Sequence, residues 1–149
     1  HPRLHGAIPY SLRIVHVGAT SVVGAPNIAG VRFVGPISDA ALLELYSSAQ
    51  YVAALRYVEG FELPAAEALC CGANAIVFGA QPAISTWYGR IAGVRSVAEN
   101  DQNLVRTLVG KFERGPKPVD VATARQVFDW SKIAPEFWRR LLTNVSGGN

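Results

Sequence analysis

Hydrophobic residues follow two alternating patterns along the chain: short β-branched runs, and segments whose apolar positions recur at helical spacing. The short runs end at glycine or at other turn residues, which is typical of buried strands. We therefore expect strands at 13–17, 31–34, 51–54, 75–78 and 95–97. The helical spacing predicts helices at 39–49, 65–71, 81–88, 104–112, 121–128 and 131–142.

Turn and capping residues mark the ends of these elements. Ser38 stands where an N-cap is needed for the first helix. Pro64 occupies a position that proline favours, the first turn of a helix, and Gly72 is a typical residue to follow the last turn. Gly89 is expected to end the short 81–88 segment in the same way, and Pro135 falls near the first turn of the last helix.

The alternation of strands and helices predicts an α/β fold, an open, doubly wound and mainly parallel sheet of Rossmann-like type with helices on both faces. The 149 residues match the size of one domain, with an irregular lead-in at 1–12, a core at 13–142 and a tail at 143–149. In a sheet of about four to six strands, we expect ligands to bind outside the carboxyl ends of the strands. The strands expected at its centre are those of Val15, Val52 and Val77.

Composition and charge exclude several functional classes. The net charge of +3 is spread without a basic block, which argues against nucleic-acid binding. The adjacent Cys70 and Cys71 are poorly placed to bridge each other, and no Cys/His ligand spacing indicates a metal site, so a reducing, cytoplasmic setting is expected. No apolar run is long enough for a transmembrane segment. His16, alone in an apolar strand, is interpreted as a core or edge residue.

The segment Glu59–Gly72 carries the residues with the clearest chemistry. A strand delivers the chain to a loop with the carboxylate of Glu59, followed by a helix that begins at Pro64. The free N–H groups and dipole of a helix N-terminus favour an anion such as a phosphate. Glu67, one turn into that helix, is a bidentate acceptor suited to the vicinal hydroxyls of a ribose. Together these groups would suit a nucleotide-sugar.

Glu67 has a second interpretation, as a charge on a solvated helix face with Glu59 and Glu62 as ordinary loop charges. The residues around it make the helix apolar on nearly every side: Ala66, Ala68, Leu69 and Cys70. A carboxylate in such a helix normally needs a partner or a function. The spacing by itself leaves both interpretations open.

The same segment resembles the E-x7-E motif, EGFGLPxxEAxAxG, of the retaining glycosyltransferases of family 4, which have the GT-B fold. Val31–Ala53 (VRFVGPISDAALLELYSSAQYVA) is similar to the strand, glycine turn, helix and strand that precede this motif in the family. Later parts of the chain also resemble the family: Asn74–Gly79, Asp101–Lys111 and Phe128–Ile133. The similarity covers about Arg13–Leu142.

The resemblance implies a role for each matching residue. Glu59 would be the catalytic residue that contacts the donor sugar, and Glu67 would bind the ribose. The backbone N–H groups that would hold the sugar and diphosphate belong to Gly60, Phe61, Glu62 and Leu63, and the turn that would contact the nucleobase is Pro36–Ile37. Glu62 replaces a glycine that is commoner in the family. The donor would be a nucleotide-diphosphate sugar, with no cofactor and no metal.

The function implied is that of the donor-binding part of a retaining glycosyltransferase of hexosyltransferase type. The strand expected at 13–17 aligns with the second strand of the family's donor half. Neither the preceding strand with its Arg/Lys loop nor the amino-terminal acceptor domain has a counterpart. We therefore expect a fragment that is inactive alone and depends on that domain or on a partner chain, in a protein that is cytoplasmic or membrane-peripheral. Two alternatives remain: a non-catalytic nucleotide-sugar-binding or interaction module, and a GT-B-type nucleotide-sugar epimerase.

Overall fold

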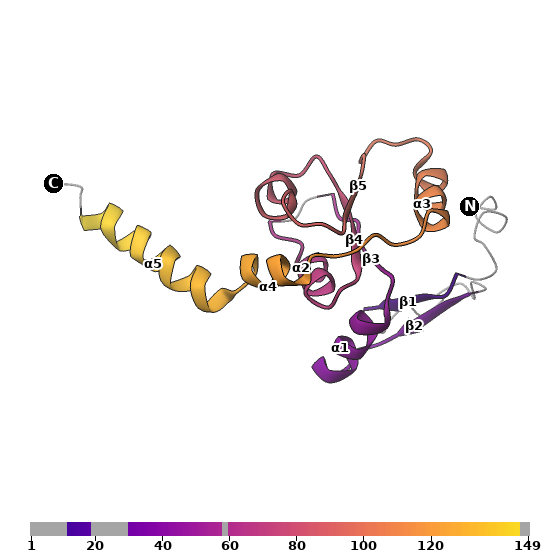
Figure 1. Ribbon diagram of the computed structural model, residues 1–149, viewed down its shortest axis with the longest axis horizontal. Coiled ribbons are helices and arrows are strands. Elements are labelled where there is room, and N and C mark those ends of the chain that lie inside the picture. The colour runs from indigo at the N-terminus through magenta and orange to yellow at the C-terminus, as the bar shows by residue number, and fades with distance from the viewer. Residues whose placement is uncertain (1–11, 19–29, 58–59, 147–149) are drawn as a thin grey trace.

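A computed structural model describes residues 12–18, 30–57 and 60–146 of the chain (Figure 1). Most of the expected lead-in and most of the loop that follows the first strand lie outside these ranges. Within them, parallel strands alternate with helices, so the predicted α/β class is confirmed. The strands are β1 (Ile14–Val17), β2 (Val31–Val34), β3 (Tyr51–Ala54), β4 (Asn74–Phe78) and β5 (Val94–Val97). The helices are α1 (Asp39–Ser48), α2 (Leu63–Cys70), a π-helical turn η1 (Ile84–Tyr88), α3 (Leu104–Glu113), α4 (Val121–Val127) and α5 (Trp130–Ser146).

The strands form two small sheets instead of the single sheet that we expected. β3, β4 and β5 are parallel neighbours in that order, and β1 pairs only with β2, also in parallel. Only the strand of Val77 is therefore central; the strand of Val52 is an edge strand, and that of Val15 belongs to the second sheet. The prediction was wrong at this point because α1, which joins β2 to β3, has no fully buried residue. It therefore supplies little packing energy to hold β2 beside β3.

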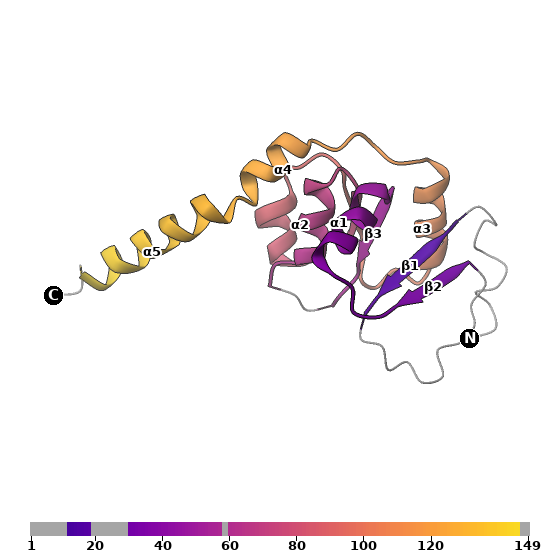
Figure 2. The same cartoon turned by 90° about the horizontal axis from the view of Figure 1, so that it is seen from below.

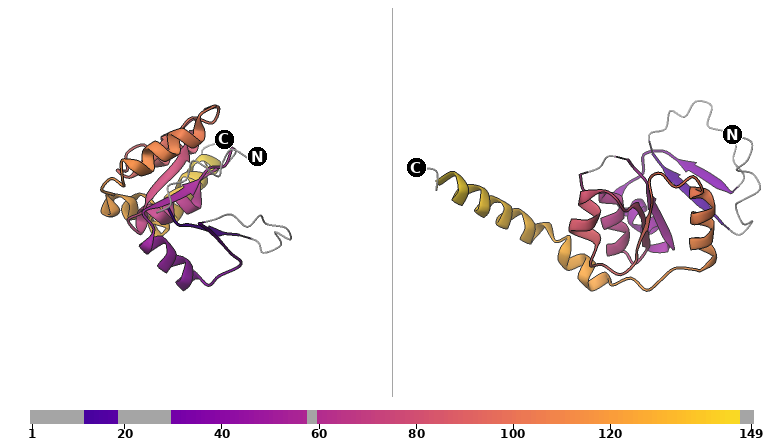
Figure 3. Two further views of the ribbon diagram at one scale, coloured as in Figure 1. Left: turned by 90° about the vertical axis from the view of Figure 1, so that its right-hand side faces the viewer. Right: turned by 90° about the horizontal axis from the view of Figure 1, so that it is seen from above.

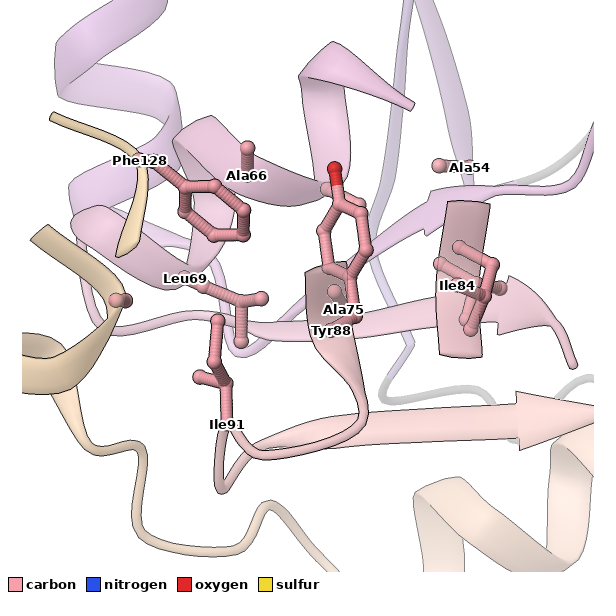
Figure 4. Packing of buried hydrophobic residues seen from close by; sticks show 11 residues of the cluster. Ala54, Ala66, Leu69, Ala75, Ile84, Tyr88, Ile91 and Phe128 are labelled. Atoms are coloured by element: carbon pink, nitrogen blue, oxygen red, sulfur yellow. The ribbon is translucent and has the colours of Figure 1, made fainter. Parts of the chain in front are cut away.

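Helices cover both faces of the three-stranded sheet, as predicted (Figure 3). On one face, α2, η1 and α4 pack on β3 and β4, around Leu69, Ala75 and Tyr88 (Figure 4). On the other face, α3 packs through Leu104, Leu108 and Phe112 against Ile76, Phe78 and Val97. Neighbouring residues of β4 thus point into opposite layers, and the whole strand is buried.

The helix ends follow the predicted capping residues closely. The Ser38 side chain accepts a hydrogen bond from the Ala41 N–H at 3.3 Å, Pro64 lies in the first turn of α2, and Gly72 has a φ of +89°. The 81–88 segment differs, because its helical part is the π-helical turn η1. In this wider turn Ile84 and Tyr88 both face the core, while the residues next to Ile84 on its C-terminal side are exposed.

The last helix is longer than its sequence pattern predicted. α5 runs to Ser146, so the first part of the expected tail is helical, and Pro135 lies inside the helix. α5 projects away from the two sheets (Figures 1 and 2). This position leaves large apolar side chains exposed: Trp130, Phe137, Trp138 and Leu142. In the described part of the chain no helix combines the length and the apolar character needed to cross a membrane.

Candidate functional site

The loop that follows β3 leads to α2 at the carboxyl edge of the three-stranded sheet. β3 ends at Ala54 and α2 begins at Leu63, and all three strands are parallel, so the N-terminus of α2 lies on the side where ligands of such sheets bind. Glu59 lies outside the described residues, and its catalytic role stays a prediction. Gly60 is exposed, and a Cβ built on it would meet no heavy atom of the described residues within 4 Å, apart from its neighbours in the chain. The backbone at Gly60 is therefore open to a close approach by a ligand.

The first turn of α2 offers fewer free amides than a typical helix N-terminus. The Glu62 carbonyl accepts hydrogen bonds from the N–H groups of Ala65 at 2.9 Å and Ala66 at 3.3 Å, and Pro64 has no N–H. Among the described residues, the Leu63 amide of this turn has no hydrogen-bond partner. The anion-binding capacity of the helix end therefore depends on Leu63 and on the loop before it.

Glu62 is the N-cap of α2 and has a left-handed backbone, with φ 55° and ψ 57°. Its side chain is 2 % exposed. A left-handed conformation costs an L-residue about 1–2 kcal/mol, whereas glycine adopts it freely. The conformation explains in physical terms why the family that this segment resembles more often has glycine at the corresponding position.

Two variants of Glu62 measure this backbone strain. Both Glu62→Gly and Glu62→Ala remove the buried carboxylate, but only the glycine relieves the left-handed conformation. We expect the glycine variant to be more stable than the alanine variant by about 1 kcal/mol in urea unfolding, although glycine is the worse residue at an ordinary helical position. Greater stability of the alanine variant would contradict a left-handed conformation at Glu62.

Aromatic residues of η1 and at the C-terminal end of α4 contact Phe61, just before α2. The Phe61 ring packs against Trp87 and Phe128, with ring centroids 5.7 and 5.6 Å apart. The Tyr88 hydroxyl shares its one hydrogen between the carbonyl oxygens of Phe61 and Glu62, the latter at 2.8 Å. Burial, and secondarily the nearby Glu62, raises the pKa of Tyr88, which keeps the hydroxyl protonated as a donor. These contacts hold Phe61 and Glu62 in place at the start of α2.

Gln81 makes a second connection at the same edge. It follows β4, is buried, and donates from its side-chain amide to the Arg56 carbonyl in the loop after β3. The sequence pattern indicated no role for Gln81 or Tyr88. Two adjacent aromatic residues, Trp87 and Tyr88, indicated a packing role, but nothing in the sequence indicated which loop they contact.

Glu67 is a residue of α2 on the side that faces α1. It is partly buried, and its carboxylate is close to the Tyr46 hydroxyl of α1. Burial, followed by the nearby Glu67 carboxylate, raises the pKa of Tyr46. The position is therefore neither fully solvated nor fully buried, and the role of Glu67 at a ribose stays a prediction. A carboxylate can accept several hydrogen bonds, so Glu67 has capacity for ribose hydroxyls even with Tyr46 nearby.

The other residues that the sequence pointed to lie outside the segment from Gly60 to Glu67. Pro36 is exposed and Ile37 partly buried in the segment that joins β2 to α1, and their role at a nucleobase stays a prediction. Cys70 and Cys71 are free thiols, and burial raises the pKa of Cys70. His16 is an exposed strand residue whose ring lies 5.3 Å from that of Phe33. No group of three or more potential metal ligands occurs in the described ranges.

Two surface hollows lie away from the residues of the motif. One, of about 300 Å³, is next to η1 and is lined by Gly79, Tyr88 and Ile91 among others. The other, of about 600 Å³, is lined by Arg95, Lys111, Arg114 and Lys117 together with Val94, Ser96 and Gly115. Neither hollow is lined by residues 60–67. The binding of a donor by the backbone of Gly60 and the first turn of α2 therefore stays a prediction.

No model of a known protein family matches the chain, and no curated protein matches it. The fold and the carboxyl-edge loop define a small α/β protein with parallel sheets, of the kind found in parts of Rossmann-like domains.

Proposed function

We propose that this chain is the donor-binding part of a retaining glycosyltransferase that uses a nucleotide-diphosphate sugar. One observation carries the proposal: the segment with E-x7-E spacing leads into a buried helix at the carboxyl edge of a parallel sheet, with Glu67 partly buried on that helix. Sheets of this kind bind nucleotides at this edge. The contacts of Phe61 and Tyr88 support the proposal, because the backbone of Phe61 and Glu62 loses less entropy on binding a ligand when it is already held in place.

Each group would have a separate task. The Leu63 amide and the open backbone at Gly60 would hold the diphosphate, and the carboxylate of Glu67 would accept from the ribose hydroxyls. Glu59 would contact the donor sugar, and Pro36–Ile37 the nucleobase. In such a transfer, negative charge develops on the departing diphosphate and is stabilised by positive groups beside it. This stabilisation of the transition state is often worth several kcal/mol. We therefore expect transfer to depend on such groups.

A titration tests the proposal directly. NMR chemical shifts or calorimetry would follow the addition of UDP, GDP and ADP, and of a sugar conjugate of each. We expect saturable binding that prefers one nucleotide, with shift changes at Gly60 and Leu63. Absence of saturable binding for all six compounds at millimolar concentration would overturn the proposal.

Glu59→Gln separates the sugar contact from the nucleotide contacts. We expect this variant to bind the sugar conjugate about tenfold more weakly and the nucleoside diphosphate as before, since a hydrogen bond to a charged group contributes about 1.5–3 kcal/mol. Glu44→Gln, at an exposed position of α1, is the matched control and should change neither affinity. An equal loss for both ligands in Glu59→Gln would refute the assignment of Glu59 to the sugar.

A further inference from the structure

Positive charges converge at the amino edge of the three-stranded sheet. Arg95 is the second residue of β5, Lys111 lies in the last turn of α3, Arg114 caps that helix, and Lys117 lies in the segment that leads to α4. These four cations line the hollow of about 600 Å³, which we call the basic hollow, and no acidic residue is among its lining. None of the four takes part in an ion pair within the described residues.

Arg95 is the most unusual of these residues. Its register partner is Ile76, which belongs to the layer under α3, so the Arg95 side chain enters the same layer. It is 8 % exposed, and its Nη1 atom has no hydrogen-bond partner in the described part of the chain. A guanidinium at such a depth normally has a carboxylate or a phosphate beside it, because an unpaired buried charge is costly.

Hydrogen bonds to the main chain fix the walls of the basic hollow. The Asn74 side chain, buried at the start of β4, donates to the Lys117 carbonyl at 2.8 Å and accepts from the Lys117 N–H at 3.0 Å. The Tyr51 hydroxyl donates to the Lys111 carbonyl at 3.2 Å. These bonds hold the backbone of two cationic residues without neutralising their side chains, so the positive groups remain available to a ligand.

The dipole of α3 accounts for only part of this cluster. Cations are favoured at the C-terminus of a helix, which explains Lys111 and Arg114. It does not explain the buried Arg95 in a strand or Lys117 beyond the helix. Burial lowers the pKa of Lys111, and the charges of Arg95, Arg114 and Lys117 lower it further. A bound anion would relieve this repulsion.

We propose that the basic hollow is a binding site for a small phosphorylated ligand whose phosphate groups contact Arg95, Lys111, Arg114 and Lys117. A guanidinium can bind a phosphate through two parallel hydrogen bonds, and lysines supply further charge. The hollow has the size of a small-molecule site. Because it lies at the amino ends of β4 and β5, it is at the opposite edge of the sheet from α2, and this inference does not depend on the proposed donor site.

Pyrophosphate is the probe that tests this site, with orthophosphate for comparison. Calorimetry and NMR titration would be done at one ionic strength, adjusted with NaCl, so that general screening stays constant. We expect one-to-one, saturable binding that is tighter for pyrophosphate than for orthophosphate, with shift changes at Arg95 and Lys117. Absence of saturable binding of both anions up to 10 mM, or changes confined to residues 60–67, would overturn the proposal; the second result would instead assign the anion to the donor site.

Charge-removing variants locate the binding. Arg114→Gln and Lys117→Gln change exposed residues and should each weaken pyrophosphate binding at least fivefold without loss of fold. Arg95→Lys keeps the charge but removes the two-pronged contact, and the same loss is expected. Arg106→Gln, at an exposed position of α3 outside the basic hollow, is the matched control and should bind as the wild type does. Equal losses in Arg106→Gln and Arg114→Gln would mean a general charge effect and overturn the site.

An oligonucleotide provides the remaining comparison. The depth of Arg95 favours a compact anion over a polymer that lies across the surface. We expect a short single-stranded RNA to compete poorly with pyrophosphate at equal phosphate concentration. Tight RNA binding that is lost in Arg114→Gln, together with no measurable binding of pyrophosphate, would overturn the proposal. The ligand of the basic hollow would then be a nucleic acid.

Discussion

Replacement of Glu67 by alanine is expected to weaken binding of the preferred nucleoside diphosphate at least tenfold. In the proposed site the Glu67 carboxylate accepts hydrogen bonds from vicinal ribose hydroxyls, and such charge-assisted bonds contribute about 1.5–3 kcal/mol. The measurement is calorimetric affinity together with the melting temperature of each variant. Micromolar binding that survives Glu67→Ala would place the ribose elsewhere.

Tyr46→Phe is the control that separates a ligand contact from a structural one. Both variants remove the interaction between the Tyr46 hydroxyl and the Glu67 carboxylate, so each should lose at most about 1 kcal/mol of stability. Only Glu67→Ala removes the acceptor for a ribose, so Tyr46→Phe should keep its affinity within about twofold. Equal losses of affinity in the two variants would mean that Glu67 acts only by joining the helices.

The largest expected loss of stability follows from Gly93→Ala. Gly93 precedes β5 with a φ of +106°, which side chains rarely allow. A Cβ at this position would lie 2.7 Å from Cγ2 of Val119 and 3.2 Å from Cδ2 of Leu69. Both are packed in the main core, and the branched Val119 has little rotamer freedom. Strain and overpacking each cost about 1–3 kcal/mol, so we expect a total loss of about 3 kcal/mol or more.

Gly115→Ala is the matched control for that substitution. Gly115 also has a positive φ, +71°, but a Cβ there would meet no heavy atom within 4 Å. We expect a loss of about 1 kcal/mol, due to the backbone conformation alone. Urea unfolding of both variants gives the difference. Equal losses would show that the space around Gly93 is not restrictive.

The candidate site divides into a part that sequence could indicate and a part that it could not. The segment from Gly60 to Glu67 was identified because its chemistry lies within a few residues. The role of Tyr88 as an anchor for that segment depends on contacts across about twenty-six residues, and the pairing of Glu67 with Tyr46 depends on how α1 meets α2. The left-handed conformation of Glu62 was not predicted either, although the glycine that is commoner at this position in the family that the segment resembles was a possible signal.

The sequence by itself determined the strands, most of the helices and their caps, because these depend on the periodicity of neighbouring side chains and on local hydrogen bonds, such as that of Ser38. Tertiary structure decided the division into two sheets and the central place of β4. It also decided the convergence of Arg95, Lys111 and Lys117, which come from a strand, a helix and a loop. The physical reason is that strand order and charge clusters depend on packing between distant segments, and the local pattern of a single segment does not specify its neighbours.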